Sequence, residues 1–212
     1  MTGTALAVGR RRHAGPRLVR LHLTSRQVPG GLALLAGCAV LLRVALHLHW
    51  MPDDGAAARQ TLLLIECAAA SVVAVAARTP FGESERATGP RLPVLRLAAS
   101  LLLTAAAAGS LALGAAAARV PGGALGLLRD VPGLAGIGLI AAAALGGALA
   151  WTGPLAYTVL AELALMDGWR TPWTWPARPA HDAGAWWCAA LAFAAGTALV
   201  AARGPRDTGG DG

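Results

Sequence analysis

The sequence contains no lysine and few charged residues of any kind. Only 14% of its 212 residues are charged, and all 18 basic residues are arginines. Without lysine the chain cannot form a phosphate-binding loop that ends in Gly-Lys-Ser/Thr, so we do not expect it to hydrolyse nucleotides by itself. It also lacks a His-Glu-x-x-His metalloprotease motif and a Gly-x-Ser-x-Gly nucleophile elbow. The sequence therefore predicts no catalytic residues, no cofactor and no enzymatic activity.

Metal-binding patterns are equally scarce. The three cysteines fall inside apolar segments without metal-site spacing, and we interpret them as small buried side chains: Cys38, Cys67 and Cys188. His47 and His49 stand close to Asp53 and Asp54, but residues two apart on a helix point in nearly opposite directions. We therefore expect no metal site and interpret these four residues as polar groups at an interface.

Charge is absent from three long stretches, and this absence defines the class of protein. No charged residue occurs over 22 residues at 97–118, 31 residues at 131–161 and 20 residues at 183–202. About 20 apolar helical residues cross the roughly 30 Å hydrocarbon core of a bilayer. Backbone that meets lipid must be helical, because its polar groups find no water there. The sequence predicts an all-α, polytopic helical membrane protein.

The expected organisation is a bundle of about six transmembrane helices at 30–202. A basic N-terminal segment at 1–29 precedes it and a flexible tail at 203–212 follows. The helices are expected at 30–50, 61–77, 94–118, 131–151, 154–167 and 184–202, with a break at Trp151-Thr152-Gly153-Pro154. The segment 154–167 is short, so a full crossing and a re-entrant helix both remain open.

The arginines predict the orientation of this bundle. With the N-terminus inside, twelve arginines fall on the cytoplasmic side and only five on the other side: Arg59, Arg119, Arg129, Arg170 and Arg178. This bias follows the positive-inside rule and predicts a plasma-membrane protein with both termini in the cytoplasm. Membrane topology thus explains the basic residues, and we expect no binding to nucleic acid. Six tryptophans at the outer helix ends agree with an interfacial aromatic belt: Trp50, Trp169, Trp173, Trp175, Trp186 and Trp187.

Three ionisable residues fall within the expected spans: Arg43, Glu66 and Glu162. Each needs a partner or water, because a charge near lipid costs at least a few kcal/mol. All three lie at similar expected depths, about 7–11 Å below the outer edge. We expect Arg43 to pair with Glu66, while Glu162 either shares that arginine or stands alone. The set is either a polar site in a translocation path or a structural ion pair that locks the helices.

Small residues recur at four-residue spacing in two expected helices. Ala105 and Gly109 form one such face, and Gly138, Ala142 and Gly146 form the other. Small residues let membrane helices approach closely. An alanine-rich chain also produces these spacings by chance, so both explanations remain open.

Two segments carry a family resemblance. Leu-Arg-Asp-Val-Pro-Gly-Leu-Ala-Gly at 128–136 and Ala-Trp-Thr-Gly-Pro-Leu-Ala-Tyr at 150–157 resemble six-span actinobacterial membrane proteins. These are permeases of the ABC-2 type or proteins that accompany such exporters. The resemblance implies a homodimer and a separate ATP-binding subunit that docks on cytoplasmic elements. In this chain those elements would be the basic N-terminal segment and the loop that carries Glu83, Glu85 and Arg86.

We therefore expect an integral membrane transporter component, either a permease-type or an accessory subunit that depends on an ATP-binding partner. The alternative is a non-transporting membrane scaffold or regulatory protein. In that case Arg43, Glu66 and Glu162 only hold the bundle together.

Overall fold

The computed structural model describes residues 28–48, 55–77, 92–116, 120–168 and 171–203. These residues form six long helices: α2 (Val28–His47), α3 (Gly55–Ala76), α5 (Leu92–Gly114), α6 (Gly123–Leu145), α7 (Thr152–Asp167) and α8 (Ala183–Arg203). Two short 3₁₀ turns, η3 (Gly147–Leu149) and η4 (Trp175–Ala177), flank α7. No strand occurs in the described ranges, and six segments are long and apolar enough to cross a membrane. An all-helical fold with six helices long and apolar enough to cross a membrane is thus confirmed for the described residues.

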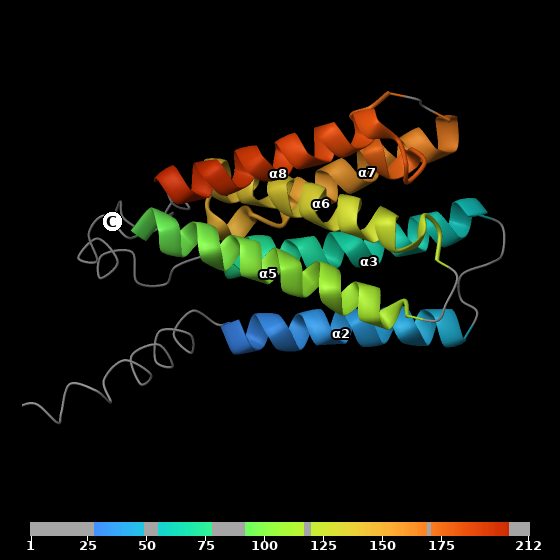
Figure 1. Cartoon of the computed structure of the whole chain (residues 1–212), viewed down its shortest axis with the longest axis horizontal. Coiled ribbons are helices and arrows are strands. Elements are labelled where there is room, and N and C mark those ends of the chain that lie inside the picture. Colours follow the sequence, from blue (N-terminus) through green and yellow to red (C-terminus); the bar gives the residue numbers. More distant parts are fainter. Residues whose placement is uncertain (1–27, 49–54, 78–91, 117–119, 169–170, 204–212) are drawn as a thin grey trace, which may run out of the picture.

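The helices lie side by side and alternate in direction (Figure 1). Helix α6 packs against α3, α5, α7 and α8, while α2 packs at the edge against α3 and α5. Burial reflects the central position of α6 and the edge position of α2, because 67% of the α6 span is buried but only 22% of the α2 span. Helix α2 begins and α8 ends at the same end of the bundle (Figure 1). We call this the η3 end, and the opposite end, which carries residues 120–122 and 171–182, the η4 end.

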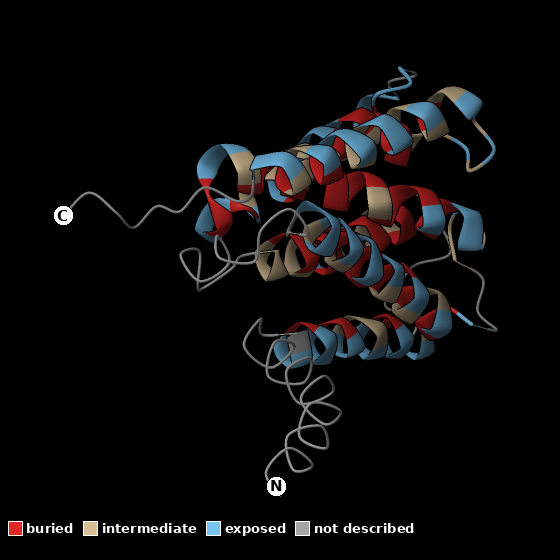
Figure 2. Ribbon diagram, turned by 60° about the vertical axis from the view of Figure 1, so that its left-hand side comes forward, coloured by how far each residue is buried: buried red, intermediate tan, exposed pale blue. Residues whose placement is uncertain are grey.

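Apolar side chains cover the outside of the bundle. Large exposed examples include Leu102, Leu113 and Leu191, which are 71%, 77% and 64% exposed. Buried residues line the inner faces of the helices, and the exposed ones face outward (Figure 2). A surface of this kind suits contact with lipid tails, and it leaves helix association to close packing and to polar contacts inside the bundle.

Two helices begin earlier than the sequence pattern predicts. Helix α3 begins at Gly55 and not at Thr61, and α6 begins at Gly123 and not at Val131. The expected starts were wrong because arginines were assigned to loops. These arginines, Arg59 and Arg129, instead lie on the inner faces of the second helical turns, where other parts of the chain accept their hydrogen bonds.

The predicted break after the fourth span is confirmed, but it begins earlier. Helix α6 ends at Leu145, where Gly146 takes a φ of 93° that disfavours a side chain. The 3₁₀ turn η3 follows, and α7 begins at Thr152. Together these residues give a segment from Gly147 to Asp167 that is 21 residues long, enough for a full crossing.

Glycines bring α6 and α8 into backbone contact. A Cβ atom at Gly136 would lie 2.4 Å from the Phe193 Cα, and one at Gly196 would lie 2.3 Å from the Gly136 carbonyl oxygen. Such contacts replace the hydrophobic effect, which does not join helices within lipid. The α6–α8 contact is the tightest helix pairing in the part of the chain that the structure describes.

The two small-residue faces differ in outcome. Gly138, Ala142 and Gly146 are buried, and a Cβ atom at Gly138 would lie 2.6 Å from the Ala74 Cβ. Close packing is therefore confirmed for this face. Ala105 and Gly109 lie exposed on α5, and nothing approaches within 4 Å of a Cβ atom built at Gly109. Within the described chain this second face packs against no helix.

Replacing Gly136 by alanine should destabilise the bundle. The added methyl group meets backbone atoms of α8, which cannot rotate away as a side chain could, and overpacking of this kind costs about 1–3 kcal/mol. The thermal unfolding midpoint in mild detergent measures the effect. Gly37→Ala on α2, where nothing lies within 4 Å of the added methyl group, is the matched control and should not lower the midpoint. Equal midpoints for the two variants would contradict the α6–α8 contact.

Candidate functional site

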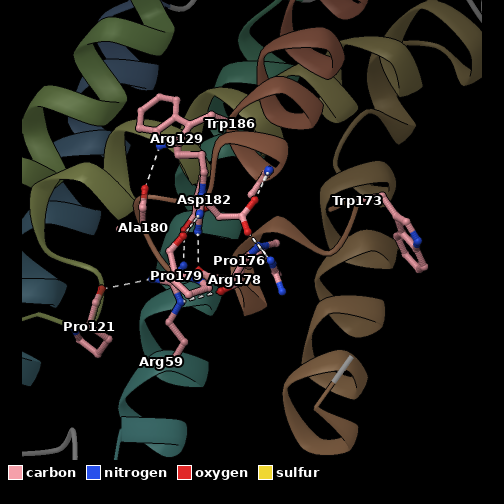
Figure 3. A network of polar contacts seen from close by, with 12 residues as sticks. Arg59, Pro121, Arg129, Trp173, Pro176, Arg178, Pro179, Ala180, Asp182 and Trp186 are labelled. Atoms are coloured by element: carbon pink, nitrogen blue, oxygen red, sulfur yellow. Dashed lines mark hydrogen bonds and ion pairs between the residues drawn. The ribbon is translucent and has the colours of Figure 1, made fainter. Parts of the chain in front are cut away.

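A network of opposite charges is buried near the η4 end (Figure 3). Arg59 comes from α3, and Arg129 and Asp130 are consecutive residues of α6. Asp130 is fully buried and accepts hydrogen bonds from both arginines, from the Arg129 Nε at 2.9 Å and from the Arg59 Nη2. Arg59 and Arg129 are themselves only 7% and 1% exposed. We call these three residues the arginine–aspartate network.

The network also holds the segment between α7 and α8. The two guanidinium groups donate four further hydrogen bonds, of 2.7–3.3 Å, to backbone carbonyls of Pro121, Pro176, Arg178 and Pro179. Three of these carbonyls belong to residues 171–182, which connect α7 to α8. A buried arginine needs several acceptors, and an irregular segment offers carbonyls that no helix has used. The segment thus supplies hydrogen-bond acceptors for the buried arginines, and the arginines hold its backbone in place.

Aromatic side chains hold the same segment from a second direction. Trp175 is 4% exposed and stacks on Tyr157 of α7 with a centroid distance of 4.4 Å. The Tyr157 hydroxyl donates to the Trp173 carbonyl oxygen at 2.6 Å. Gly133 leaves room for the Trp175 ring, since a Cβ atom there would lie 2.8 Å from it. Trp175 was expected in the interfacial belt, but it belongs to the core.

Asp182 forms the start of α8. Its Oδ1 accepts a hydrogen bond from the Ala185 amide at 2.8 Å, which is the geometry of a helix N-cap. Its other oxygen pairs with Arg178. The hydrogen bond from the Ala185 amide, and after it the one from Arg178, lower the pKa of the Asp182 carboxyl. The helix start and the network are joined through Arg178, whose carbonyl accepts a bond from Arg129.

Glu66 lies deeper on the same face of α3 as Arg59. The two residues are seven positions apart, which corresponds to about two helical turns. Glu66 is fully buried, and neither of its carboxyl oxygens has a hydrogen-bond partner. The charges that act on it are those of Asp130, Arg59 and Arg129. An unpartnered buried carboxyl group is costly, so this position is unusual for a purely structural residue.

The expected pair of Arg43 and Glu66 is not formed. Arg43 lies on the exposed side of α2 and donates to the Ala116 carbonyl oxygen at 2.6 Å. Glu162 of α7 is half-buried and lies beside Gln60, so it does not join Glu66 or Arg43 either. The three predicted residues are therefore not brought together. The helix faces decide this result, because Glu66 points toward α6 charges that the sequence pattern had assigned to loops.

The predicted docking loop and three of the polar residues considered above lie outside the described residues. These are the docking loop with Glu83, Glu85 and Arg86, and the residues His49, Asp53 and Asp54. Among the residues that the structure describes, no group of three histidine, cysteine, aspartate or glutamate side chains could hold a metal ion.

Sequence reasoning missed Arg59, Arg129 and Asp130 as site residues. One available signal was the seven-residue spacing that places Arg59 and Glu66 on one helix face. Another was the apolar sequence on both sides of Arg129 and Asp130, which suits a helix that carries two compensated charges. The partner carbonyls gave no signal, because they lie 49 to 117 positions away along the chain.

The network can do two things chemically. It joins α3, α6 and the segment 171–182 through charge-assisted hydrogen bonds, and it presents arginine donors at one end of the bundle. Searches against family models, curated proteins and solved structures find no match for this chain.

Removing the central carboxylate should destabilise the protein strongly. Asp130→Asn leaves two arginines buried with one less negative charge, and breaking a buried ion pair costs about 3–5 kcal/mol. The unfolding midpoint and the yield of monodisperse protein in detergent measure this loss. The exposed Asp167→Asn exchange is the control and should behave like the parent protein. A midpoint for Asp130→Asn as high as that of the control would show that the network contributes little.

Proposed function

We propose that this protein is an integral membrane component of a transport system, a permease-type or accessory subunit that works with a separate ATP-binding partner. The observation that carries the proposal is Glu66, a fully buried carboxyl group without a hydrogen-bond partner beneath the arginine–aspartate network. Ionisable groups inside membrane bundles are costly and mark substrate or ion pathways by default. Neither carboxyl oxygen of Glu66 makes a hydrogen bond that would give it a structural role.

The distribution of arginines supports an orientation for the proposed subunit. Arg59 and Arg129 lie within helices, so the connections at the η4 end carry only Arg119, Arg170 and Arg178. By the same criterion, which leaves out Arg96 and Arg203 as helix residues, ten of the 18 arginines belong to the opposite side. This bias favours cytoplasmic termini at the η3 end and a plasma-membrane location. The loop 78–91, which the family resemblance assigns to a partner, then belongs to the cytoplasmic side.

The resemblance also implies two copies of the subunit. The outward-facing small residues Ala105 and Gly109 on α5 give two copies a surface for close helix contact. Light scattering of the purified protein in detergent distinguishes the dimer from the monomer.

A scaffold protein is the second candidate function, and one specific observation favours it. The buried arginines donate to three backbone carbonyls of the segment 171–182 and so fasten it to the bundle. Under this alternative the buried charges serve structure alone, and Glu66 has no part in activity.

Purification from native membranes should recover an ATP-binding subunit with this chain. Replacing Glu83, Glu85 and Arg86 by alanine should reduce that recovery about tenfold, because each charged contact contributes on the order of 0.5–1 kcal/mol. Mass spectrometry with labelled standards measures the ratio. Alanine at Ser84 and Thr88, in the same loop, is the matched control and should not change it. Recovery of this chain without any ATP-binding subunit would contradict the transport proposal and support the scaffold.

The Glu66→Gln variant separates the two functions once the complex is isolated. This substitution removes no hydrogen bond, so we expect the free energy of unfolding to change by less than about 1 kcal/mol. Transport-coupled ATP hydrolysis by the complex should nevertheless fall about tenfold or more, equivalent to about 1.4 kcal/mol of barrier. Glu162→Gln, away from the network, should retain activity. Full activity of Glu66→Gln would show that this carboxyl group is structural.

A further inference from the structure

An open pocket lies over the arginine–aspartate network at the η4 end. Its volume is about 260 Å³, and residues from four parts of the chain line it: Arg59, Pro121, Gly122, Arg129, Leu165 and the segment 176–180. Figure 3 shows the side chains of Arg59 and Arg129 reaching toward this region from α3 and α6, while the Arg178 side chain is directed at Asp182. Three arginines and no carboxylate line the pocket.

The lining arginines keep unused hydrogen-bond donors. A guanidinium group carries five N–H donors. Arg59 uses three of them, toward Pro176, Pro121 and Asp130. Arg129 also uses three, one on each nitrogen. Each therefore retains two donors on its terminal nitrogens, and these belong to groups that the fold holds rigidly. Rigid donors suit an anion, because little entropy is lost when it binds.

The charge around the pocket identifies the class of anion. Arg59, Arg129 and Arg178 line the pocket, whereas the carboxylates close to them, Asp130, Asp182 and Glu66, do not. Glu66 lies deeper and does not line the pocket. The pocket therefore presents positive charge and N–H donors to a ligand, and the simplest ligand that suits it is a singly charged anion with several acceptor oxygens. A phosphodiester group has this charge, and arginine recognises phosphate through paired N–H donors.

The surroundings place the pocket at the depth of lipid headgroups. It lies at the ends of α3 and α6, where the chain leaves the bundle. Trp186 is nearby and donates its indole N–H to the Ala180 carbonyl oxygen at 2.8 Å. Trp173 and Trp187 are 45% and 69% exposed at the same end. Exposed tryptophans of membrane proteins prefer this interfacial zone.

We propose that the pocket lined by Arg59, Arg129 and Arg178 binds a singly charged phosphodiester group. Such a group comes either from a phospholipid headgroup or from a water-soluble diester. The site goes beyond the proposed transport function, because binding requires neither a partner subunit nor transport.

Two variants of one ion pair test the proposal. Arg178→Gln and Asp182→Asn both break the Arg178–Asp182 pair, so their structural cost is shared, but they change the charge beside the pocket in opposite directions. Asparagine at 182 retains the helix cap, because it is as good an N-cap residue as aspartate. The Arg129 bond to the Arg178 carbonyl involves only backbone at residue 178, so both variants retain it.

The measurement is native mass spectrometry of the full chain in neutral detergent, titrated with phosphatidylglycerol. We expect one retained lipid for the parent protein, about tenfold weaker retention for Arg178→Gln, and unchanged or tighter retention for Asp182→Asn. Diacylglycerol, which has the same chains but no phosphate, should not be retained. Equal weakening of both variants, or equal retention of diacylglycerol, would overturn the proposal.

Glycerophosphoglycerol distinguishes the two sources of the group. Competition by this soluble diester would show that the phosphodiester alone is recognised. Without competition, but with the expected difference between the two variants, the phosphodiester is that of a lipid. Leucine at Ala177, which lines the pocket, should fill it and abolish retention in either case. Because the chain is tested alone, failure here leaves the recovery of an ATP-binding subunit as a separate result.

Discussion

The fold at the η4 end depends on one buried carboxylate. Asp130 lies between two arginines from different helices, and without it their charges would face each other inside the bundle. With Asp130 in place, the remaining arginine donors can reach backbone carbonyls of the segment 171–182. Burying three charged side chains is expensive, and the ion pairs and backbone hydrogen bonds of the network offset this cost.

Close packing and charge pairing act on different parts of the same helix. Along α6, Gly133 and Gly136 admit Trp175 and the backbone of α8, while Asp130 lies about one turn earlier and binds Arg59 of α3. Lipid supplies no hydrophobic drive that would join helices. Helix α6 is therefore central because it offers both small residues for contact and a charge for pairing.

The membrane class, the number of spans and the break near residue 150 could be predicted from the sequence, because long uncharged stretches and glycine are local signals. The site could not. Arg59 and Arg129 resemble loop residues when only neighbouring positions are considered, and the groups that make their burial tolerable lie far along the chain. Glu66 was identified correctly as an intramembrane charge, but its expected partner Arg43 faces outward on α2. The rotation of α2 about its own axis, which depends on tertiary packing, decides that Arg43 faces outward and does not meet Glu66.

The most direct test of this account is hydrogen–deuterium exchange of the Arg129→Met variant in detergent. Methionine keeps an apolar stem but loses the bonds to the carbonyls of Arg178 and Pro179, while Arg59 still pairs with Asp130. If the network holds the segment 171–182, amide exchange within it should accelerate about tenfold or more, and exchange in α5 should not change. Unchanged exchange within 171–182 would contradict the account.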